Sequence, residues 1–332
     1  MFHSDHMRLV VLGGTVFLSH AVAADAVARG HEVTCACRGT SGSVPEGARL
    51  VTWDRDQPVP AELAEGGFDA VVDVARHPSR VRSAVAALPD AHWVFVSTVN
   101  VYADDTTPGG TPGTIPLRDP ITEDVDLAED PEAYGGMKVA CERIVLDEAA
   151  SATVVRPGLI VGPGDPTGRF SYWPRRLARG GNVLAPGSPD DLMQVIDVRD
   201  LAAWIVTLAE NRTEGVYDGV GEPMEMWRML GECAAGVGDT GAAYTWVGQD
   251  RLTELDVEPW MGPESIPLWL PRPDYDGLPT HDVEPSLSAG LELRSIAETS
   301  RDTLAWLEEQ PDAPVSGISA EREAELLRLA TT

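Results

Sequence analysis

Strands and helices alternate through the first half of the chain, and this alternation constrains the fold most. Helical spacing of apolar residues predicts helices over 16–29, 79–88 and 134–149. Apolar runs predict strands over 8–14, 32–38, 49–53, 69–74, 92–98 and 153–156. Strands that alternate with helices through short connections form a parallel sheet covered on both faces. The sequence therefore predicts an α/β fold with a doubly wound parallel sheet.

The second half of the chain differs in composition and in the pattern of its apolar residues, and it predicts a smaller lobe interleaved with the sheet. A length of 332 residues is long for one ordinary domain. After about residue 162 the chain turns irregular, and 222–283 is rich in Trp, Met and Pro. We expect a dinucleotide-binding domain from 7–161 and 191–221, a substrate-binding lobe from 162–190 and 222–309, and a tail or helix over 310–332.

Charge and composition limit the partners. The net charge of −28, from 25 basic and 53 acidic residues, repels nucleic-acid phosphates and anionic lipid. No apolar run reaches the roughly 18 residues of a membrane span. The first seven residues are polar and predict a disordered leader rather than a signal peptide. The four cysteines form neither a disulfide framework nor a zinc-binding pattern. We predict a cytoplasmic protein with a small-molecule substrate and no metal.

A glycine turn joins the first predicted strand to the first helix. Such a turn aims backbone N–H groups and the helix dipole at a pyrophosphate. As a G-x-x-G-x-x-G motif, the segment keeps only Gly13, because Val16 and Ser19 occupy the other two glycine positions. The alternative is an ordinary tight turn. The residues expected to contact a dinucleotide here are Gly13, Thr15, Val16, Phe17 and Leu18.

The end of the second strand favours one form of the cofactor. An arginine there accepts a 2′-phosphate, whereas an acidic residue binds a free ribose 2′-hydroxyl. Arg38 stands at this position, which favours NADP(H) over NAD(H), unless its side chain only stacks on the adenine. Asp54, after the third strand, is either a partner for the adenine amino group or an exposed loop aspartate.

The chain has a single lysine, Lys138, four residues after Tyr134. On a helix these two positions share a face. An ammonium beside a phenol lowers the pKa of the tyrosine from about 10 towards neutrality. A tyrosine tuned in this way can pass a proton to or from a carbonyl or hydroxyl group near pH 7. The alternative is an exposed helical pair without a role.

Together these segments resemble the extended short-chain dehydrogenase/reductase family, which includes NAD-dependent epimerases and dehydratases. The resemblance runs from about Arg8 to Leu307. It is carried by Gly-Gly-Thr-x-Phe at 13–17, Val-Phe-Val-Ser-Thr-Val-Asn-Val-Tyr at 94–102, Tyr-x-x-x-Lys at 134–138, Arg-Pro-Gly-Leu-Ile-Val-Gly-Pro at 156–163 and Asp-Val-Arg-Asp-Leu-Ala at 197–202. It implies a Rossmann fold and a homodimer formed through helices next to the Tyr134 helix.

The resemblance also implies the roles of the site residues. Tyr134 is the general acid/base, Lys138 orients the nicotinamide ribose, and Thr98 hydrogen-bonds the substrate oxygen. Further cofactor contacts are expected from Val74, Ala75, Ser97, Pro157 and Gly158. Substrate contacts are expected from Asn100, Tyr102, Arg169, Trp173 and Arg176.

Three functions stay open. The first is an NADP(H)-dependent oxidoreductase acting on a small carbonyl or alcohol. The second is a nucleotide-sugar epimerase, for which Arg169, Arg175, Arg176, Arg179 and Arg272 could grip a diphosphate. The third is a catalytically idle binding or regulatory protein of the same fold. Sugar dehydration is excluded, because Val99-Asn100 follows Thr98 where the dehydratases of the family carry Asp-Glu.

The long connection over 103–133 interrupts the alternation of strands and helices. It is rich in proline, glycine and acidic residues and leads directly to Tyr134. A structureless loop of this length in a compact domain is often functional. It is either a lid over the site or a solvated surface excursion.

Overall fold

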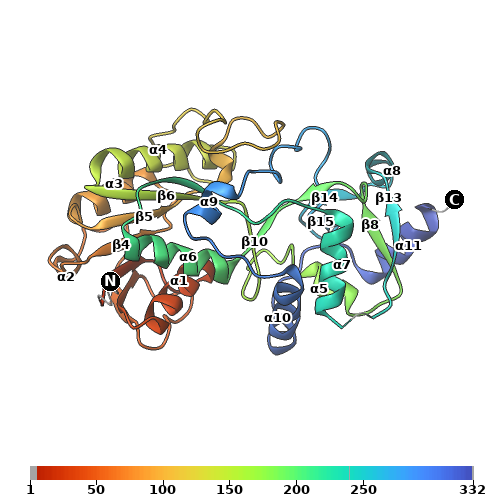
Figure 1. The fold of residues 1–332 in the computed structure, drawn as a ribbon, viewed down its shortest axis with the longest axis horizontal. Helices are drawn as coiled ribbons and strands as arrows, with labels where there is room; N and C mark the ends of the chain where they lie inside the picture. The colour runs from red at the N-terminus through yellow and green to blue at the C-terminus, as the bar shows by residue number, and fades with distance from the viewer. Residues whose placement is uncertain (1–5, 239, 331–332) are drawn as a thin grey trace.

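The computed structural model describes residues 6–238 and 240–330. Its centre is a parallel sheet with the strand order β3-β2-β1-β4-β5-β6-β11 (Figure 1). The strands are β1 (Arg8–Leu12), β2 (Glu32–Cys37), β3 (Arg49–Thr52), β4 (Ala70–Asp73), β5 (His92–Val96), β6 (Ser151–Pro157) and β11 (Gly215–Gly219). This architecture confirms the predicted α/β fold class. Most of the predicted leader lies outside the described residues.

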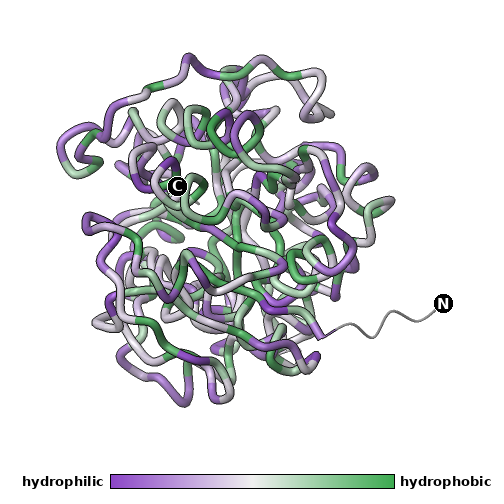
Figure 2. Tube along the Cα trace, turned by 90° about the vertical axis from the view of Figure 1, so that its left-hand side faces the viewer, coloured by the Kyte–Doolittle hydropathy of each residue, from purple (hydrophilic) through white to green (hydrophobic). Residues whose placement is uncertain are grey.

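Helices cover both faces of this sheet because its strands are apolar on both sides. Along β1, Leu9 and Val11 belong to one buried cluster, and Val10 and Leu12 belong to another on the opposite face. The helices α1 (Phe17–Ala28) and α6 (Val198–Asn211) pack together on the first face, and α3 (Pro78–Ala87) and α4 (Ala133–Glu148) on the second. Figure 2 shows hydrophobic segments through the middle of the molecule and hydrophilic loops around them.

The strand order reverses between β1 and β4. From β1 the chain moves outward to β2 and β3, and it then returns to β4 on the other side of β1. Open α/β sheets bind ligands at such a switch point, in the crevice beyond the carboxyl ends of the strands. The glycine turn after β1, Ala75 after β4 and Thr98 after β5 all follow strand ends at this edge.

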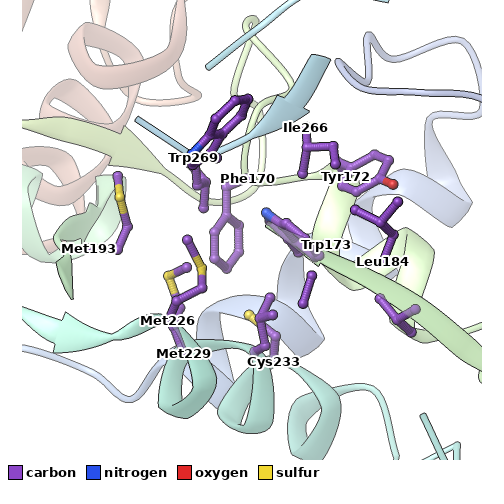
Figure 3. Packing of buried hydrophobic residues seen from close by; sticks show 14 of the residues in the cluster. Phe170, Tyr172, Trp173, Leu184, Met193, Met226, Met229, Cys233, Ile266 and Trp269 are labelled. Carbon is purple, nitrogen blue, oxygen red and sulfur yellow. The ribbon is translucent and has the colours of Figure 1, made fainter. Parts of the chain in front are cut away.

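A second lobe is built mainly from residues between β7 and the C-terminus. Its core buries Phe170, Trp173 and Met229, with Trp269 and Ile266 against them (Figure 3). Its elements are β7 (Leu159–Val161), α5 (Tyr172–Leu177), β8 (Asn182–Pro186), β9 (Leu192–Met193), β10 (Val195–Asp197), β12 (Met224–Glu225), α7 (Met226–Gly236), β13 (Ala243–Val247), α8 (Gln249–Glu254), β14 (Glu258–Trp260), β15 (Ser265–Pro267), α10 (Ile296–Glu309) and α11 (Ala320–Ala330). The remaining short helices are α2 (Ala61–Ala64), the 3-10 turn η1 (Val99–Val101) and α9 (Glu284–Ser288).

A buried ionic network ties α4 to the neighbouring strands β6 and β11. The Arg156 guanidinium donates to both carboxylate oxygens of Glu142 at 3.0 and 2.7 Å and to the Tyr102 hydroxyl at 3.0 Å. Tyr102 in turn donates to Asp218 at 2.6 Å, and the other Asp218 oxygen lies 3.0 Å from His281 Nδ1. All five side chains are buried. Tyr102 therefore has a structural role, which corrects its prediction as a substrate contact.

The connection over 103–133 contains no helix or strand of its own, apart from the first residue of α4 at its end. It packs against the segment 277–282: Gly277 and Leu278 both donate to the Asp105 carbonyl, and Gly109 donates to the Thr280 carbonyl. The connection therefore supports another loop rather than standing free in solvent. Among the described residues, no helix has the length and apolar character needed to cross a lipid bilayer.

Candidate active site

The turn after β1 has the geometry of a dinucleotide-binding turn despite its missing glycines. Gly13 and Gly14 have φ angles of +141° and +107°, which favour glycine. Ser19, at the position of the third glycine, is buried. Its Oγ accepts from the Gly14 amide at 3.0 Å and donates to the Val16 carbonyl at 2.9 Å. Ser19 therefore closes the turn with hydrogen bonds of its own.

Val16 is compatible with the same turn. It has an extended backbone with φ −132°, which any residue adopts, and its side chain is 45% exposed. Helix α1 begins at the next residue, Phe17. The first amides of a helix have no partner within the helix and attract phosphate oxygens. The residues present thus fit a dinucleotide pyrophosphate, with the amides of Phe17 and Leu18 as its expected donors.

Gly14→Ala is expected to destabilise the protein and weaken dinucleotide binding. A Cβ at Gly14 would lie 2.4 Å from the Cys35 sulfur, and relieving that overlap costs about 1–3 kcal/mol. Gly30→Ala is the matched control, because Gly30 has φ +88° and nothing within 4 Å of its Cβ position. Urea unfolding should show a larger loss for Gly14→Ala, and Cys35→Ala should recover part of it. Equal losses at the two glycines would contradict this packing argument.

Arg38 and Asp54 lie at the ends of β2 and β3. Arg38 is exposed, and its guanidinium makes no hydrogen bond or ion pair among the described residues. Asp54 is also exposed, and its carboxylate accepts from the Asp56 amide at 3.1 Å. Arg38 is therefore free to meet a phosphate, whereas Asp54 already holds its own turn. Their contacts with a cofactor stay predictions.

Thr98 and Tyr134 face a common cavity of about 570 Å³ between the sheet and the second lobe. Thr98 Oγ1 accepts from the Asn100 amide at 3.2 Å. Burial raises the pKa of Tyr134 above its ordinary value, although a hydrogen bond to the Thr98 side chain and the charge of Arg76 act in the opposite direction. At neutral pH Tyr134 is therefore a neutral phenol, able to donate a proton to an oxygen in the cavity.

Lys138 points into the protein below this cavity. It is 1% exposed, and its ammonium donates to the carbonyls of Ala75 at 2.8 Å and Val96 at 2.5 Å. The ammonium also lies 4.3 Å from the centre of the Phe95 ring. Burial lowers the pKa of Lys138 to about 8. The prediction that Lys138 lowers the pKa of Tyr134 is wrong for this structure, because the ammonium is turned to backbone carbonyls and the pKa of Tyr134 is raised.

The lowered pKa of the buried Lys138 ammonium predicts that the stability of the protein depends on pH. Since the folded pKa of about 8 lies below the ordinary 10.5, the unfolded chain binds more protons between these values. The contribution of Lys138 to stability should therefore rise from pH 8 to 10.5, by on the order of 3 kcal/mol. The cysteines also titrate at alkaline pH and affect the unfolding free energy of both proteins. The difference in unfolding free energy between wild type and Lys138→Met therefore isolates the contribution of Lys138. A difference that is flat with pH would show that the pKa of Lys138 is not lowered.

The other expected cofactor contacts lie at the same strand ends. Gly158 lines the cavity, and the Ala75 carbonyl holds Lys138. Val74 lies beside Gly13, since a Cβ there would be 3.5 Å from its methyl group. The buried Ser97 hydroxyl has no hydrogen-bond partner among the described residues. Thr15 is half-buried, and Leu18 and Pro157 are buried.

Only two of the predicted substrate contacts line the cavity, namely Asn100 and Arg169. Trp173 is fully buried in the core of the second lobe, and its indole N–H donates to the Pro267 carbonyl at 3.0 Å. Arg176 is buried and paired with Glu323 at 2.5 Å. These positions correct the predictions for Trp173 and Arg176, whose side chains stabilise the lobe instead.

The sequence did not single out the residues that complete the cavity. Asp165 is fully buried, with one carboxylate oxygen accepting from the Thr167 amide at 2.8 Å and hydroxyl at 2.7 Å. Its other oxygen has no hydrogen-bond partner among the described residues. The Arg169 guanidinium lies 4.7 Å from the centre of the Trp260 ring. Trp260 has φ +72°, and Tyr275 and Gln194 also line the cavity.

The connection over 103–133, for which a lid was one of two interpretations, does not line the cavity in this structure. Its contacts with 277–282 reach the cavity indirectly, because Leu278 and Pro279 form part of the wall. The interpretation of this connection as a lid is therefore wrong for this conformation, and it acts as a support for the wall.

The sheet order and the cavity at the strand ends together define a Rossmann fold with a ligand site in the usual crevice. Residues 75–219 match the model of the NAD dependent epimerase/dehydratase family. This match supports the resemblance to the extended short-chain dehydrogenase/reductase family that the motifs predicted.

Relatives with curated names differ in what they do. The chain is 29% identical over 170 residues to the UDP-glucose 4-epimerase of Corynebacterium glutamicum. The matched region covers 44% of this chain and 47% of that protein. It is 23% identical over 226 residues to the chloroplast stem-loop binding protein of 41 kDa b of Arabidopsis thaliana, which covers 63% of this chain and 56% of that protein. The chain thus spans about half the length of the curated relatives it matches.

Solved structures show the same fold. The Bordetella bronchiseptica enzyme WbmH in complex with NAD+ superimposes with a TM-score of 0.63 at 15% identity, over 91% of this chain and 98% of that chain. At this identity the similarity shows the fold alone.

Proposed function

We propose that this chain is an NADP(H)-dependent oxidoreductase acting on a carbonyl or alcohol carbon of a small molecule. The observation that supports it most is the pairing of Thr98 with a protonated Tyr134 at a cavity that also reaches Phe17, the first residue of α1. A nicotinamide dinucleotide held at the α1 turn would supply or accept the hydride. The chain's own groups handle the proton and the oxygen.

The proton chemistry follows from the two hydroxyl groups. In reduction, a substrate carbonyl oxygen gains negative charge as its carbon receives the hydride. Tyr134 would give its proton to that oxygen, and the Thr98 hydroxyl would hydrogen-bond the same oxygen. In oxidation the proton moves back to Tyr134, which must then start as a phenolate. The raised pKa of Tyr134 favours the donating role in the free protein.

The cavity walls support a small and partly apolar substrate. Among the lining residues, Trp260, Tyr275, Leu270 and several prolines give apolar surface. Arg169 is the one arginine among them. Arginine forks form the strongest hydrogen bonds to phosphate oxygens, so a lining with a single arginine favours a substrate without a diphosphate.

A nucleotide-sugar epimerase is the second candidate, favoured by the match to a UDP-glucose 4-epimerase. Of the arginines expected to grip its diphosphate, Arg272 is paired with Asp276 at 2.9 Å. Arg176 is paired with Glu323, and Arg175 and Arg179 do not line the cavity. This candidate therefore depends on Arg169, or on a rearrangement of the lobe when substrate binds.

The candidates separate in a direct assay. Purified protein is mixed with NADPH or NADH, and binding is followed by nicotinamide fluorescence. Loss of NADPH absorbance with a panel of carbonyl compounds supports the oxidoreductase. Interconversion of UDP-glucose and UDP-galactose without cofactor consumption supports the epimerase instead. Absence of both cofactor binding and turnover would overturn the proposal in favour of a catalytically idle protein.

Arg38→Gln is expected to weaken NADPH binding by about tenfold or more and to change NADH binding little. The reason is the loss of charge-assisted hydrogen bonds to the 2′-phosphate, each worth about 1.5–3 kcal/mol. Fluorescence titration with both cofactors measures the ratio. A parallel loss for both cofactors, or no loss for either, would remove the assignment of NADP(H).

A role in nucleic-acid binding, suggested by the stem-loop binding relative, is opposed by the net charge of −28. The predicted homodimer and cytoplasmic location remain proposals.

A further inference from the structure

A second pocket of about 320 Å³ lies in the second lobe and shares no residue with the cavity at Tyr134. It is formed between α5 and the segment that leads into α11. Its lining residues are Tyr172, Arg175, Arg176, Arg179 and residues 315–320. Three arginines around one small pocket are notable in a chain with a net charge of −28.

The three guanidinium groups are not equally occupied. Arg176 is buried and donates to Glu323 at 2.5 Å and to the Gly180 and Asn182 carbonyls. The Arg179 side chain is 47% exposed and reaches the same carboxylate only at 3.5 Å. Arg175 is exposed, and its side chain has no hydrogen bond or ion pair among the described residues. Two guanidinium groups are therefore available to an anion, and Glu323 is largely neutralised by Arg176.

Hydroxyl groups complete the donors around the pocket. Figure 3 shows the Tyr172 hydroxyl pointing away from the apolar cluster that holds its ring. Ser319 Oγ accepts from the Arg322 amide at 3.1 Å, which leaves its own proton free to donate. Arginine forks together with hydroxyl donors suit the oxygens of a phosphate group. We propose that this pocket binds the phosphate group of a small molecule, as free phosphate or as a phosphate monoester.

The pocket is joined to the active-site cavity by the segment 316–318. Ser316 donates through its amide to the Gly168 carbonyl at 3.1 Å and through its hydroxyl to the Thr167 carbonyl at 3.0 Å. Thr167 lines the cavity. An anion that fixes residues 315–320 would therefore also fix the loop that carries Asp165 and Arg169.

A second connection runs from the same segment to Trp260. The Gly317 amide donates to the Gly262 carbonyl at 3.0 Å, and the Ile318 amide donates to the Ser265 carbonyl at 3.0 Å. Gly262 lies two residues after Trp260, which lines the cavity. Phosphate in the pocket thus stabilises two walls of the active-site cavity, and the pocket acts as an effector site.

Calorimetric titration tests binding without any need for activity. Inorganic phosphate and glycerol phosphate are titrated at constant ionic strength into wild type, into Arg175→Gln/Arg179→Gln, and into a control of equal charge loss, Arg228→Gln/Arg301→Gln. The control arginines are exposed and outside this pocket. We expect the pocket variant to lose about tenfold or more in affinity, since charged hydrogen bonds are worth about 1.5–3 kcal/mol each. If only one of the two probes binds to wild type, that probe shows whether the pocket takes free phosphate or a phosphate monoester.

Hydrogen exchange tests the connection to the cavity. Saturating phosphate should slow exchange at the amides of Ser316, Gly317 and Ile318 in wild type and in the control, and not in the pocket variant. No detectable binding to wild type, or equal affinity in the two double variants, would overturn the site. Binding without slower exchange at these three amides would overturn its role as an effector site. Each outcome is independent of whether the protein proves to be an oxidoreductase.

Discussion

Replacing Tyr134 by phenylalanine should reduce turnover by at least about 10²–10⁴-fold, the typical contribution of a positioned proton donor. The phenol is the group that can give a proton to a substrate oxygen beside Thr98. Phenylalanine keeps the ring and its packing and removes only the hydroxyl. Dinucleotide binding should therefore change little, because the turn at Gly13 and the first amides of α1 are untouched.

The measurement is kcat/KM with the substrate on which the wild type is active, together with a cofactor titration. Tyr217→Phe is the matched control, since its hydroxyl donates to the Glu214 carbonyl at 3.3 Å outside the cavity. Turnover retained in Tyr134→Phe would overturn the assignment of Tyr134. Equal losses of turnover in both variants would point to a general effect on the fold.

Arg156→Met should strongly destabilise the protein, with a loss of about 3–5 kcal/mol in the free energy of unfolding. The variant leaves the Glu142 carboxylate buried without its bidentate partner and removes the donor to the Tyr102 hydroxyl. An unpaired buried carboxylate costs far more than an exposed one. The effect should appear as a lower urea midpoint.

The double variant Arg156→Met/Glu142→Leu provides the control. It removes both charges, so it should be more stable than Arg156→Met alone. A loss below about 1 kcal/mol for the single variant, the level of an exposed ion pair, would show that the pair is solvated. The exposed pair Arg82–Glu148, at 3.7 Å, serves as that reference.

The framework of the sheet could be predicted from local sequence. The predicted strand over 92–98 and helix over 134–149 correspond to β5 (His92–Val96) and α4 (Ala133–Glu148). Strand ends are set by the sheet, so Thr98 and Gly158 could be assigned to the crevice from their positions after strands. The turn at Gly13 could be located for the same reason, although the role of Ser19 in closing it was not foreseen.

The parts that depend on tertiary packing could not be predicted in the same way. Helical spacing places Lys138 on the same face as Tyr134, but it does not show that the ammonium turns to the Ala75 and Val96 carbonyls. Trp173 lies in a segment rich in aromatic and basic residues, and only the packing of the lobe shows that it is core.

The other wall of the cavity could not be predicted, because its residues lie far apart in the sequence. Asp165 and Trp260 are almost a hundred residues apart, and Trp260 ends a short strand that the sequence does not indicate. Asp165 could have been suspected from its place in a Pro-Gly-Asp-Pro turn shortly after a strand end. Its burial and its unpartnered oxygen are visible only in the structure.

The single lysine allows the central claim, that a dinucleotide binds at the strand ends beside Tyr134 and above the buried Lys138, to be tested by one resonance. Protein labelled with ¹³C-lysine gives one Lys138 signal, whose pH titration is followed with and without NADP+. We predict a pKa of about 8 in the free protein and a shift of the signal when the cofactor binds. A pKa near the ordinary value of 10.5 with no response to bound cofactor would contradict the account.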